Sequence, residues 1–332
     1  MHPSLRALAD RQLGAFSAVD AQRAGYGHPE IRHLLSSGRW VRLRRGIYVT
    51  ADDLTTASAT PAQRHRLDCM AALLALRRPS AVVSHTSAAR LWGLPVHRDA
   101  PRVVRLTDAG QWRKGNGFVV VPAPLGPDER CRSGPVPITS AARTLTDCAR
   151  EWPLDDAVIA MDAALLAERT TSRELRSAAS AATGWPGARR AARAAQLADG
   201  RAESPLETRG RLRIAGSGFD VPALQVEIHA GAGMLGVVDA WFDEAAVAVE
   251  FDGQVKYTAP WRGRTPERVL WDEKLREDEM RALGIRFLRV VDADLRRWPV
   301  IEERLRRLLA EPGPTQRLFR AVPRLRGVQR AA

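Results

Sequence analysis

The chain has 332 residues, of which 45% are hydrophobic, and it carries 51 lysines and arginines against 38 aspartates and glutamates. A chain of this length is longer than a domain with a single hydrophobic core usually is, and its apolar content excludes a disordered chain. We therefore expect two or three folded domains. The net charge of +13 favours a polyanionic partner, with nucleic acid first and an anionic membrane surface second. An arginine-rich surface that serves solubility alone is the alternative.

The three cysteines, Cys69, Cys131 and Cys148, have neither disulfide nor zinc-site spacing, which favours a reducing, cytoplasmic setting. The N-terminal stretch lacks the apolar core of a secretory signal. No window reaches the roughly 18 uncharged apolar residues of a membrane span, so no membrane-spanning helix is expected.

Residues 1–55 read as three helices followed by a hairpin. A helix is expected over residues 4–13, Ser17 is a suitable N-cap for the second helix, and Pro29 stands at the first position of the third. Gly46 can form the turn of the arginine-rich hairpin "RWVRLRRGIYVT".

Two helices joined by a tight turn and followed by a basic hairpin are the order of a winged helix-turn-helix domain that binds DNA. On this interpretation Arg32 and His33 face the major groove from the second helix of the motif, and the hairpin arginines contact phosphates. Those arginines are Arg39, Arg42, Arg44 and Arg45. A small helical domain with a solvated basic hairpin is the alternative.

The remaining boundaries follow from composition. Residues 56–182 are predicted to form a mostly helical middle region, with short β-like runs between residues 102 and 122. The Ala- and Arg-rich residues 183–202 are predicted to form a helical linker. Residues 311–332 read as a disordered basic tail, with a weak DNA-binding arm as one option.

Residues 203–310 read as α-β-β-β-α-β, followed by a last helix, because the hydrophobic period changes from 3.6 to 2 and back. Alternate residues of a strand share a face. In "AAVAVEFDG", Glu250 and Asp252 are therefore expected on an alanine-lined face, opposite the apolar face that carries Val247 and Val249.

The preceding strand carries Asp239, which a hairpin can bring to the same face. A turn of two or four residues around Asp243 and Glu244 would pair Asp239 with Ala248, diagonal to Glu250. A turn of three or five residues would place Asp239 on the opposite face.

On one face, Asp239 and Glu250 could hold Mg²⁺ or Mn²⁺ together with water molecules, which is a means of activating water and neutralising phosphate charge. Lys256, just past the second strand, could stabilise a transition-state charge or help orient the nucleophile. The sequence therefore allows a metal site for phosphodiester hydrolysis.

The N-terminal part resembles a known family. "SHTSAARLWGLP" and "VPITSAARTLTDCAR", following the arginine-rich hairpin, are similar to the abortive-infection type IV antitoxins over about residues 5–170. That resemblance implies a DNA-binding repressor with an N-terminal winged helix and a helical region after it. It also makes a cognate toxin a candidate partner beside DNA.

The C-terminal part resembles the PD-(D/E)XK nucleases, and most of all the very-short-patch-repair-like endonuclease domains, through "SPLE", "VVDAWF", "VEFDG" and "EKLREDEMRALGIRFLRV". The resemblance implies that Glu207 lies near the metal and that Asp239 and Glu250 bind it. Asp252 stands where the superfamily has its lysine, as in the patch-repair-like variant. Lys256 departs from the histidine that many of those domains have nearby, which leaves the general base open.

Each of these residues also has a structural interpretation. Glu207 belongs to a capping box that begins at Ser204, and Asp252 can be part of a turn. Asp239 and Glu250 can instead form ion pairs with Lys256 or Arg276. The cations of the following helix could line a DNA groove or only be solvated; they are Lys274, Arg276 and Arg281.

The combined expectation is an α+β multi-domain protein with a winged helix-turn-helix domain, a helical middle region and a restriction-endonuclease-like domain. Its function would be DNA binding with Mg²⁺-dependent cleavage, in DNA repair or phage defence. A non-enzymatic repressor or antitoxin that keeps the nuclease fold as a scaffold is the alternative, and a nuclease directed at RNA is a third. The oligomeric state is left open.

Overall fold

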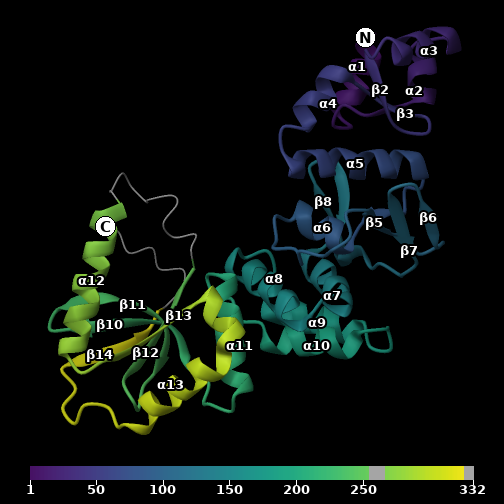
Figure 1. Ribbon diagram of the computed structural model, residues 1–332. Coiled ribbons are helices and arrows are strands. Elements are labelled where there is room, and N and C mark those ends of the chain that lie inside the picture. Colours follow the sequence, from purple (N-terminus) through teal and green to yellow (C-terminus); the bar gives the residue numbers. More distant parts are fainter. Residues whose placement is uncertain (254–265, 325–332) are drawn as a thin grey trace. The chain divides into compact units, whose positions relative to one another are not determined.

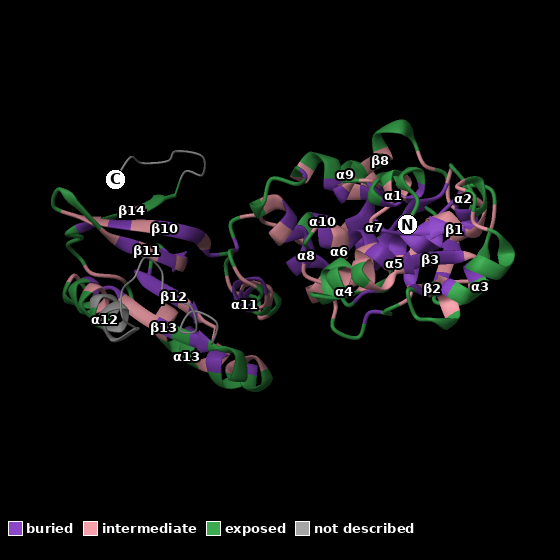
Figure 2. Ribbon diagram, turned by 90° about the horizontal axis from the view of Figure 1, so that it is seen from above, coloured by how far each residue is buried: buried purple, intermediate pink, exposed green. Residues whose placement is uncertain are grey.

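The computed structural model describes residues 1–253 and 266–324, except for the side chains of 266–270, 272 and 273 (Figure 1). The chain divides into two compact units, Met1–Ala198 and Asp199–Ala332. Each unit has its own buried cores, and the purple segments of Figure 2 are these cores. The division lies close to residue 203, where the last domain was expected to begin.

The first 50 residues form the predicted three helices and hairpin, with one additional short strand. The elements are α1 (Pro3–Asp10), β1 (Phe16–Ser17), α2 (Ala18–Arg23), α3 (His28–Ser36), β2 (Trp40–Arg44) and β3 (Ile47–Thr50). Ser17 caps α2 as predicted, in a capping box with Asp20. The first helix ends earlier than expected because Leu13 and Gly14, with φ of +59° and +87°, have left the helical conformation.

The hairpin β2–β3, called the wing below, pairs with β1 in a sheet of order β1-β3-β2. Gly46 takes φ of +73° at the wing's turn, a conformation that costs glycine little. Phe16, Trp40 and Ile31 pack in the core beneath, and the rings of Phe16 and Trp40 meet edge to face at 4.7 Å. This core fixes α3 and the wing relative to each other.

The expectation of a mostly helical middle region is only partly right, because this region contains a sheet of order β6-β7-β5-β4-β9-β8. The elements are α4 (Ala51–Ala57), α5 (Pro61–Leu76), β4 (Val82–Val83), α6 (His85–Leu91), β5 (Val104–Thr107), β6 (Arg113–Gly115), β7 (Phe118–Val121), η1 (Pro127–Glu129), β8 (Arg130–Ser133) and β9 (Val136–Thr139). The predicted β-like runs between residues 102 and 122 are confirmed as β5, β6 and β7, whereas β4, β8 and β9, of two to four residues, are too short for an alternating pattern to show in the sequence.

The predicted linker is instead part of the first unit. The helices here are α7 (Ala141–Glu151), α8 (Leu154–Leu166), α9 (Ser172–Ala181) and α10 (Ala188–Leu197). Helix α10 packs against α7, α8 and α9 through buried Ala191, Ala194 and Ala195. A helix of the predicted kind is present, but its alanine face is a packing face and not a solvated connector.

The second unit is a five-stranded sheet of order β13-β12-β11-β10-β14 with helices on both faces. Its elements are α11 (Pro205–Gly216), β10 (Ala223–Ala230), β11 (Gly233–Phe242), β12 (Val247–Asp252), α12 (Pro266–Ala282), β13 (Arg286–Val291), η4 (Asp292–Arg297), α13 (Trp298–Ala310) and β14 (Phe319–Pro323). Val247, Val249 and Phe251 pack against α11 and α13, whereas Ala246 and Ala248 pack on the α12 side. The order α-β-β-β-α-β and the two faces of β12 are as predicted.

The tail was expected to be disordered, but its described part forms a strand. Strand β14 pairs antiparallel with β10, and Phe319 is buried with its ring 5.9 Å from the ring of Trp241. The pairing with β10 and the packing of Phe319 and Ala321 on the core thus dock this segment against the sheet.

The register of the β11–β12 hairpin differs from the predicted one by two residues. Ala240 pairs with Val249, and the same register continued by one residue sets Asp239 opposite Glu250 rather than Ala248. The turn spans residues 243–246 and is closed by a hydrogen bond from Ala246 N to the Asp243 carbonyl of 3.1 Å. The centre of this turn lies one residue later in the sequence than the predicted centre, which was between Asp243 and Glu244.

We predict that Gly210→Ala destabilises the second unit. Gly210 lies in α11 where a Cβ would stand 1.9 Å from a ring carbon of fully buried Phe251, so one of the two must move. Overpacking of this kind costs about 1–3 kcal/mol, which thermal unfolding should register as a lower Tm. Gly216→Ala in the same helix meets nothing within 4 Å and is the matched control. Equal Tm values for the two variants would contradict the proposed packing.

Candidate functional sites: a basic wing and a carboxylate pair

The wing and α3 present cations to solvent. Arg32 and His33 are exposed on α3, and their neighbours Ile31 and Leu34 are buried, so the helix has its apolar face inward and these two side chains outward. The other exposed cations of this surface are Arg39, Arg42 and Arg45. These placements are compatible with the predicted contacts to a DNA groove and to phosphates.

Arg44 differs from the other wing arginines because it turns toward the middle region. Its guanidinium donates to the carbonyls of Asn116 and Gly117, the latter at 3.4 Å, and lies 5.3 Å from the centre of the Phe118 ring. Burial lowers the pKa of this guanidinium. Arg44 therefore has a structural role at the wing, which the repeating arginines of the sequence could not distinguish from phosphate contacts.

In the second unit, two predicted site residues meet beneath the sheet. Glu207 stands in the first turn of α11 and is only 5% exposed. The side-chain amide of Gln225 lies between the two acids, with Nε2 donating to Glu207 Oε2 at 3.2 Å and to Asp239 Oδ1 at 3.3 Å. Asp239 Oδ2 also accepts from the backbone N–H of Phe251 at 2.8 Å. Two carboxylates thus share one amide in a buried place.

Gln225 is the site residue that sequence reasoning missed. In "VPALQVEIHA" it alternates with apolar residues and therefore reads as a solvent-facing residue of the strand. In the structure it is buried and takes φ of +52°, a costly conformation for a residue other than glycine. At this residue β10 changes face: Leu224 packs on the α11 side, whereas Val226 packs on the α12 side. No sequence pattern signals that change.

The structure confirms the structural interpretation of Glu207, and its metal-site role stays a prediction. Ser204 Oγ accepts from Glu207 N at 3.1 Å, and Glu207 Oε2 accepts from Glu203 N at 2.8 Å, so the acid satisfies backbone donors at the start of α11. Burial, with repulsion from Asp239 as the second cause, nevertheless raises the pKa of Glu207 to about 7. The Glu207 carboxyl therefore takes up a proton near neutral pH.

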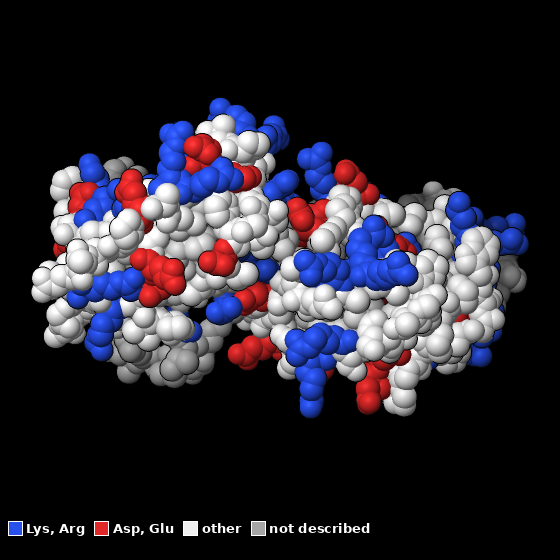
Figure 3. Space-filling view, turned by 90° about the horizontal axis from the view of Figure 1, so that it is seen from below, with Lys and Arg blue, Asp and Glu red and all other residues white. Residues whose placement is uncertain are grey.

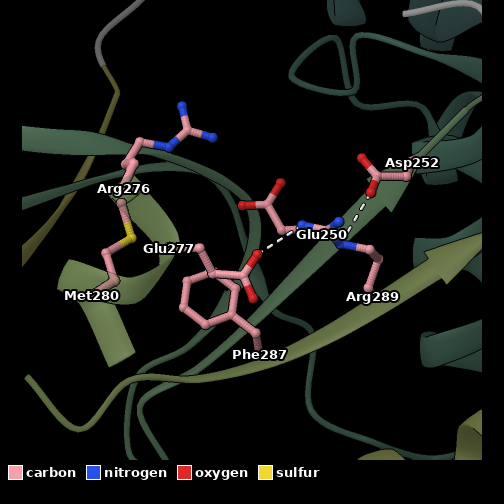
Figure 4. A pocket seen from close by; sticks show the side chains of 7 residues that line it. All are labelled: Glu250, Asp252, Arg276, Glu277, Met280, Phe287 and Arg289. Carbon is pink, nitrogen blue, oxygen red and sulfur yellow. Dashed lines mark hydrogen bonds and ion pairs between the residues drawn. The ribbon is translucent and has the colours of Figure 1, made fainter. Parts of the chain in front are cut away.

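The other two predicted acids line a pocket on the α12 side (Figure 4). Glu250 and Asp252 project into it from β12, and Arg276 enters from α12. Asp252 is paired with Arg289 Nε of β13 at 3.0 Å, and Arg289 also binds Glu277 at 2.7 Å. Asp252 is therefore held in an ion-pair network with Arg289 and Glu277. These contacts do not support a role of Asp252 as a general base.

The remaining predicted residues are dispersed. Lys274 is exposed on α12, while Arg281 pairs with Glu277 at 2.6 Å and lies 5.1 Å from the Phe287 ring centre. Arg276 is the member of this set that lines the pocket with Glu250. Lys256 lies outside the described residues.

Whether these residues suit a metal ion depends on the number of oxygen donors. Among the described side chains, which leave out 254–270, 272, 273 and 325–332, no three acidic, histidine or cysteine side chains group as ligands. Mg²⁺ commonly takes only one or two protein carboxylates and keeps several waters. Glu207 and Asp239, which repel each other while both are charged, match that smaller requirement, and the oxygen of the Gln225 amide is a further donor type nearby.

We predict that the Glu207→Gln variant changes how stability depends on pH. The folded pKa of about 7 lies above the ordinary value of 4.5, so the protonated acid favours folding below about pH 4.5 and this contribution is lost as pH rises through 7. The variant cannot ionise, so relative to wild type it should gain up to about 3 kcal/mol across that window. Chemical unfolding at several pH values measures the difference. Parallel profiles for the two proteins would refute the buried-acid assignment, and Glu244→Gln in the exposed turn is the control.

Comparisons with known proteins support one part of the expected resemblance. Residues 3–51 match the family described as transcriptional regulator, AbiEi antitoxin. The chain is 28% identical over 266 residues to two Mycobacterium tuberculosis proteins, covering 80% of this chain and 90% of each relative; they are the uncharacterized proteins MT2308 (strain CDC 1551) and Rv2248 (strain H37Rv).

Among solved structures, the crystal structure of the RV2827C protein from Mycobacterium tuberculosis aligns with a TM-score of 0.39 and 15% identity, over 62% of this chain and 78% of that one. This likeness is too low to establish a common fold.

Among the described residues, no helix is long and apolar enough to cross a membrane. The antitoxin-like N-terminal part is thus supported, whereas the nuclease resemblance is not confirmed.

Proposed function

We propose that this protein is a DNA-binding transcriptional regulator of the antitoxin type. The observation that carries the proposal is that the matched residues, 3–51, coincide with the helices and the wing whose cations are exposed. In this arrangement α3 reads the major groove and the wing fixes the protein on the phosphates. A cognate toxin is the second partner that the family description suggests.

The local charge of the wing supports DNA better than the net charge does. Residues 39–50 contain four arginines and no acid. On the face drawn in Figure 3, by contrast, cationic and anionic side chains are interspersed. A short, rigid segment whose charges are all positive produces a stronger local electrostatic field than the same charges spread over a surface.

We predict that Arg42→Gln combined with Arg45→Gln weakens DNA binding, because two cations that neutralise phosphates are removed. The slope of log Kd against log salt should fall by about 0.9 for each phosphate that is no longer neutralised. Fluorescence anisotropy of the full chain, on the duplex that precedes its own gene, measures both affinity and slope. Arg173→Gln with Arg176→Gln, on the exposed face of α9, removes the same charge and is the matched control.

An unchanged slope in the wing variant, with the protein still folded, would sink the assignment of the wing to DNA. Arg44 is kept intact in this test because its hydrogen bonds to Asn116 and Gly117 make it part of the fold. Weaker binding that follows from unfolding is thereby separated from weaker binding that follows from fewer neutralised phosphates.

A second function, metal-dependent phosphodiester hydrolysis, is favoured by one specific observation in the second unit. Glu207 and Asp239 are brought together around Gln225 at a strained backbone position, and strain of this kind often accompanies a functional site. When bound, Mg²⁺ would supply an activated water and neutralise phosphate charge. Glu207 and Asp239 would hold the ion, and Gln225 would orient both carboxylates.

Glu250 and Arg276 would contribute from the neighbouring pocket. Both line its wall, so an anionic substrate there would meet the guanidinium of Arg276 beside the carboxylate of Glu250. The Arg289 pairs with Asp252 and Glu277 would keep the far wall of the pocket in place. Arg276 would thus bind the substrate, and Asp252 would have a structural part.

We predict that wild-type protein nicks supercoiled plasmid in Mg²⁺ or Mn²⁺, and that Asp239→Asn with Glu250→Gln abolishes the nicking while DNA binding by the first unit remains. Glu244→Gln, an exposed acid of the β11–β12 turn, should nick as wild type does. The measurement is conversion of supercoiled to open-circular DNA on a gel, with an RNA substrate run in parallel.

Equal background nicking by wild type and the double variant would reject the enzymatic proposal. The second unit would then be the scaffold of a non-enzymatic repressor, and the double variant would retain the footprint on the operator. Cleavage of RNA alone would indicate the RNA-directed alternative.

A further inference from the structure

The turn between β6 and β7 lies directly against the wing. Arg44 reaches from the wing to the carbonyls of Asn116 and Gly117, which form that turn. The ring of Phe118 lies between two arginines, with its centre 5.3 Å from the guanidinium carbon of Arg44 and 5.9 Å from that of Arg113. The wing and the β6–β7 hairpin are therefore held together as one body.

The hairpin has little freedom to take another shape. A Cβ at Gly115 would stand 2.2 Å from a ring carbon of Phe118, so a glycine is needed where the ring crosses the strand. Gly117 follows with φ of +70°, the conformation that completes the turn. Gly115 and Gly117 thus determine the shape of the hairpin that lies beside the wing.

The side chains that this hairpin presents to solvent are of two kinds. Trp112 is 66% exposed, far more than a large aromatic ring usually is in a folded chain. Arg113 and Lys114 follow it and are exposed as well. No acid occurs in residues 109–121 or in residues 39–50, so the hairpin continues the positive charge of the wing.

An exposed indole flanked by cations suits a partner that offers both negative charge and flat apolar surface. The DNA backbone offers both, since phosphates alternate with deoxyribose rings. Arg113 and Lys114 would neutralise phosphates, and the Trp112 ring would pack on the sugar between them. An acidic protein surface offers negative charge, but it lacks the regular alternation of phosphates and sugar rings. The hairpin is also continuous with the wing, which we have proposed to bind DNA.

We propose that the β6–β7 hairpin is a second DNA-contacting element, which extends the wing's contacts along the phosphate backbone outside the matched residues 3–51. The proposal rests on the DNA-binding function proposed above. It adds that the middle region takes part in DNA binding through Trp112, Arg113 and Lys114, positioned by Arg44 and Phe118.

The test uses the full chain and the same duplex as for the wing. Arg113→Gln with Lys114→Gln should reduce the salt slope by nearly two, at about 0.9 per phosphate neutralised. Trp112→Ala should weaken binding severalfold and leave the slope unchanged, because it removes no charge. The matched control is Arg130→Gln with Arg132→Gln on β8, two exposed arginines at the opposite edge of the same sheet.

The outcomes separate this proposal from the one it rests on. If the hairpin variants bind as wild type does while the Arg42/Arg45 variant is weakened, the hairpin proposal is overturned and the DNA-binding function stands. If wild type binds no duplex, both fail. If the hairpin variants lose only affinity for single-stranded RNA, the hairpin contacts a different nucleic acid and the duplex proposal is overturned. Unchanged thermal unfolding of each variant shows that the fold is intact and that weaker binding arises at the surface.

Discussion

The close approach of α11 to β12 at Gly210 is the contact on which the site of the second unit depends. Because Gly210 has no side chain, the buried ring of Phe251 can lie against the helix. This packing of α11 on Phe251 brings the first turn of the helix, which carries Glu207, onto the sheet beside Asp239. The carboxylate is desolvated by the same packing that positions it, so the fold sets both the location of this acid and its pKa.

The competition of interactions at Glu207 explains why capping and chemistry are compatible there. Burial and Asp239 disfavour the charged acid, whereas the backbone N–H of Glu203 and the side chain of Ser204 favour it. The disfavouring causes prevail, since the pKa lies well above the ordinary value. A capping acid that only stabilised the helix would gain nothing from facing a second carboxylate. Glu207 thus accepts from the start of α11 and also shares the amide of Gln225 with Asp239.

What could be predicted from the sequence depended on how locally each feature is determined. Ser17, Pro29 and Gly46 mark helix starts and a turn through their own conformational preferences, and the structure confirms each element that they bound. In the middle sheet, β5 and β7 coincide with the predicted β-like runs between residues 102 and 122, whereas β4, β8 and β9 are only two to four residues long, are stabilised by distant partners and were not predicted. The register of β11 and β12 was wrong by two residues because the four-residue turn is centred one residue later than the acidic pair suggested, although its length was among those predicted. Gln225 was missed because a single positive φ changes which face its neighbours occupy.

The arginines show why net charge alone is a poor guide to a binding surface. In the first unit, Arg143 and Arg150 bind buried Asp147 at 3.0 and 3.2 Å and both lie on the ring of Trp185, so they hold α7 against the α9–α10 connection. Arg44 is likewise committed to the fold, although it belongs to the most basic stretch of the wing. A cation is more available to a phosphate where it is exposed and where its segment contains no acid to pair with it. That condition holds for the wing and again for the β6–β7 hairpin, and Arg44 joins the two. By joining the wing to the hairpin, Arg44 therefore enlarges the basic surface that the exposed arginines present.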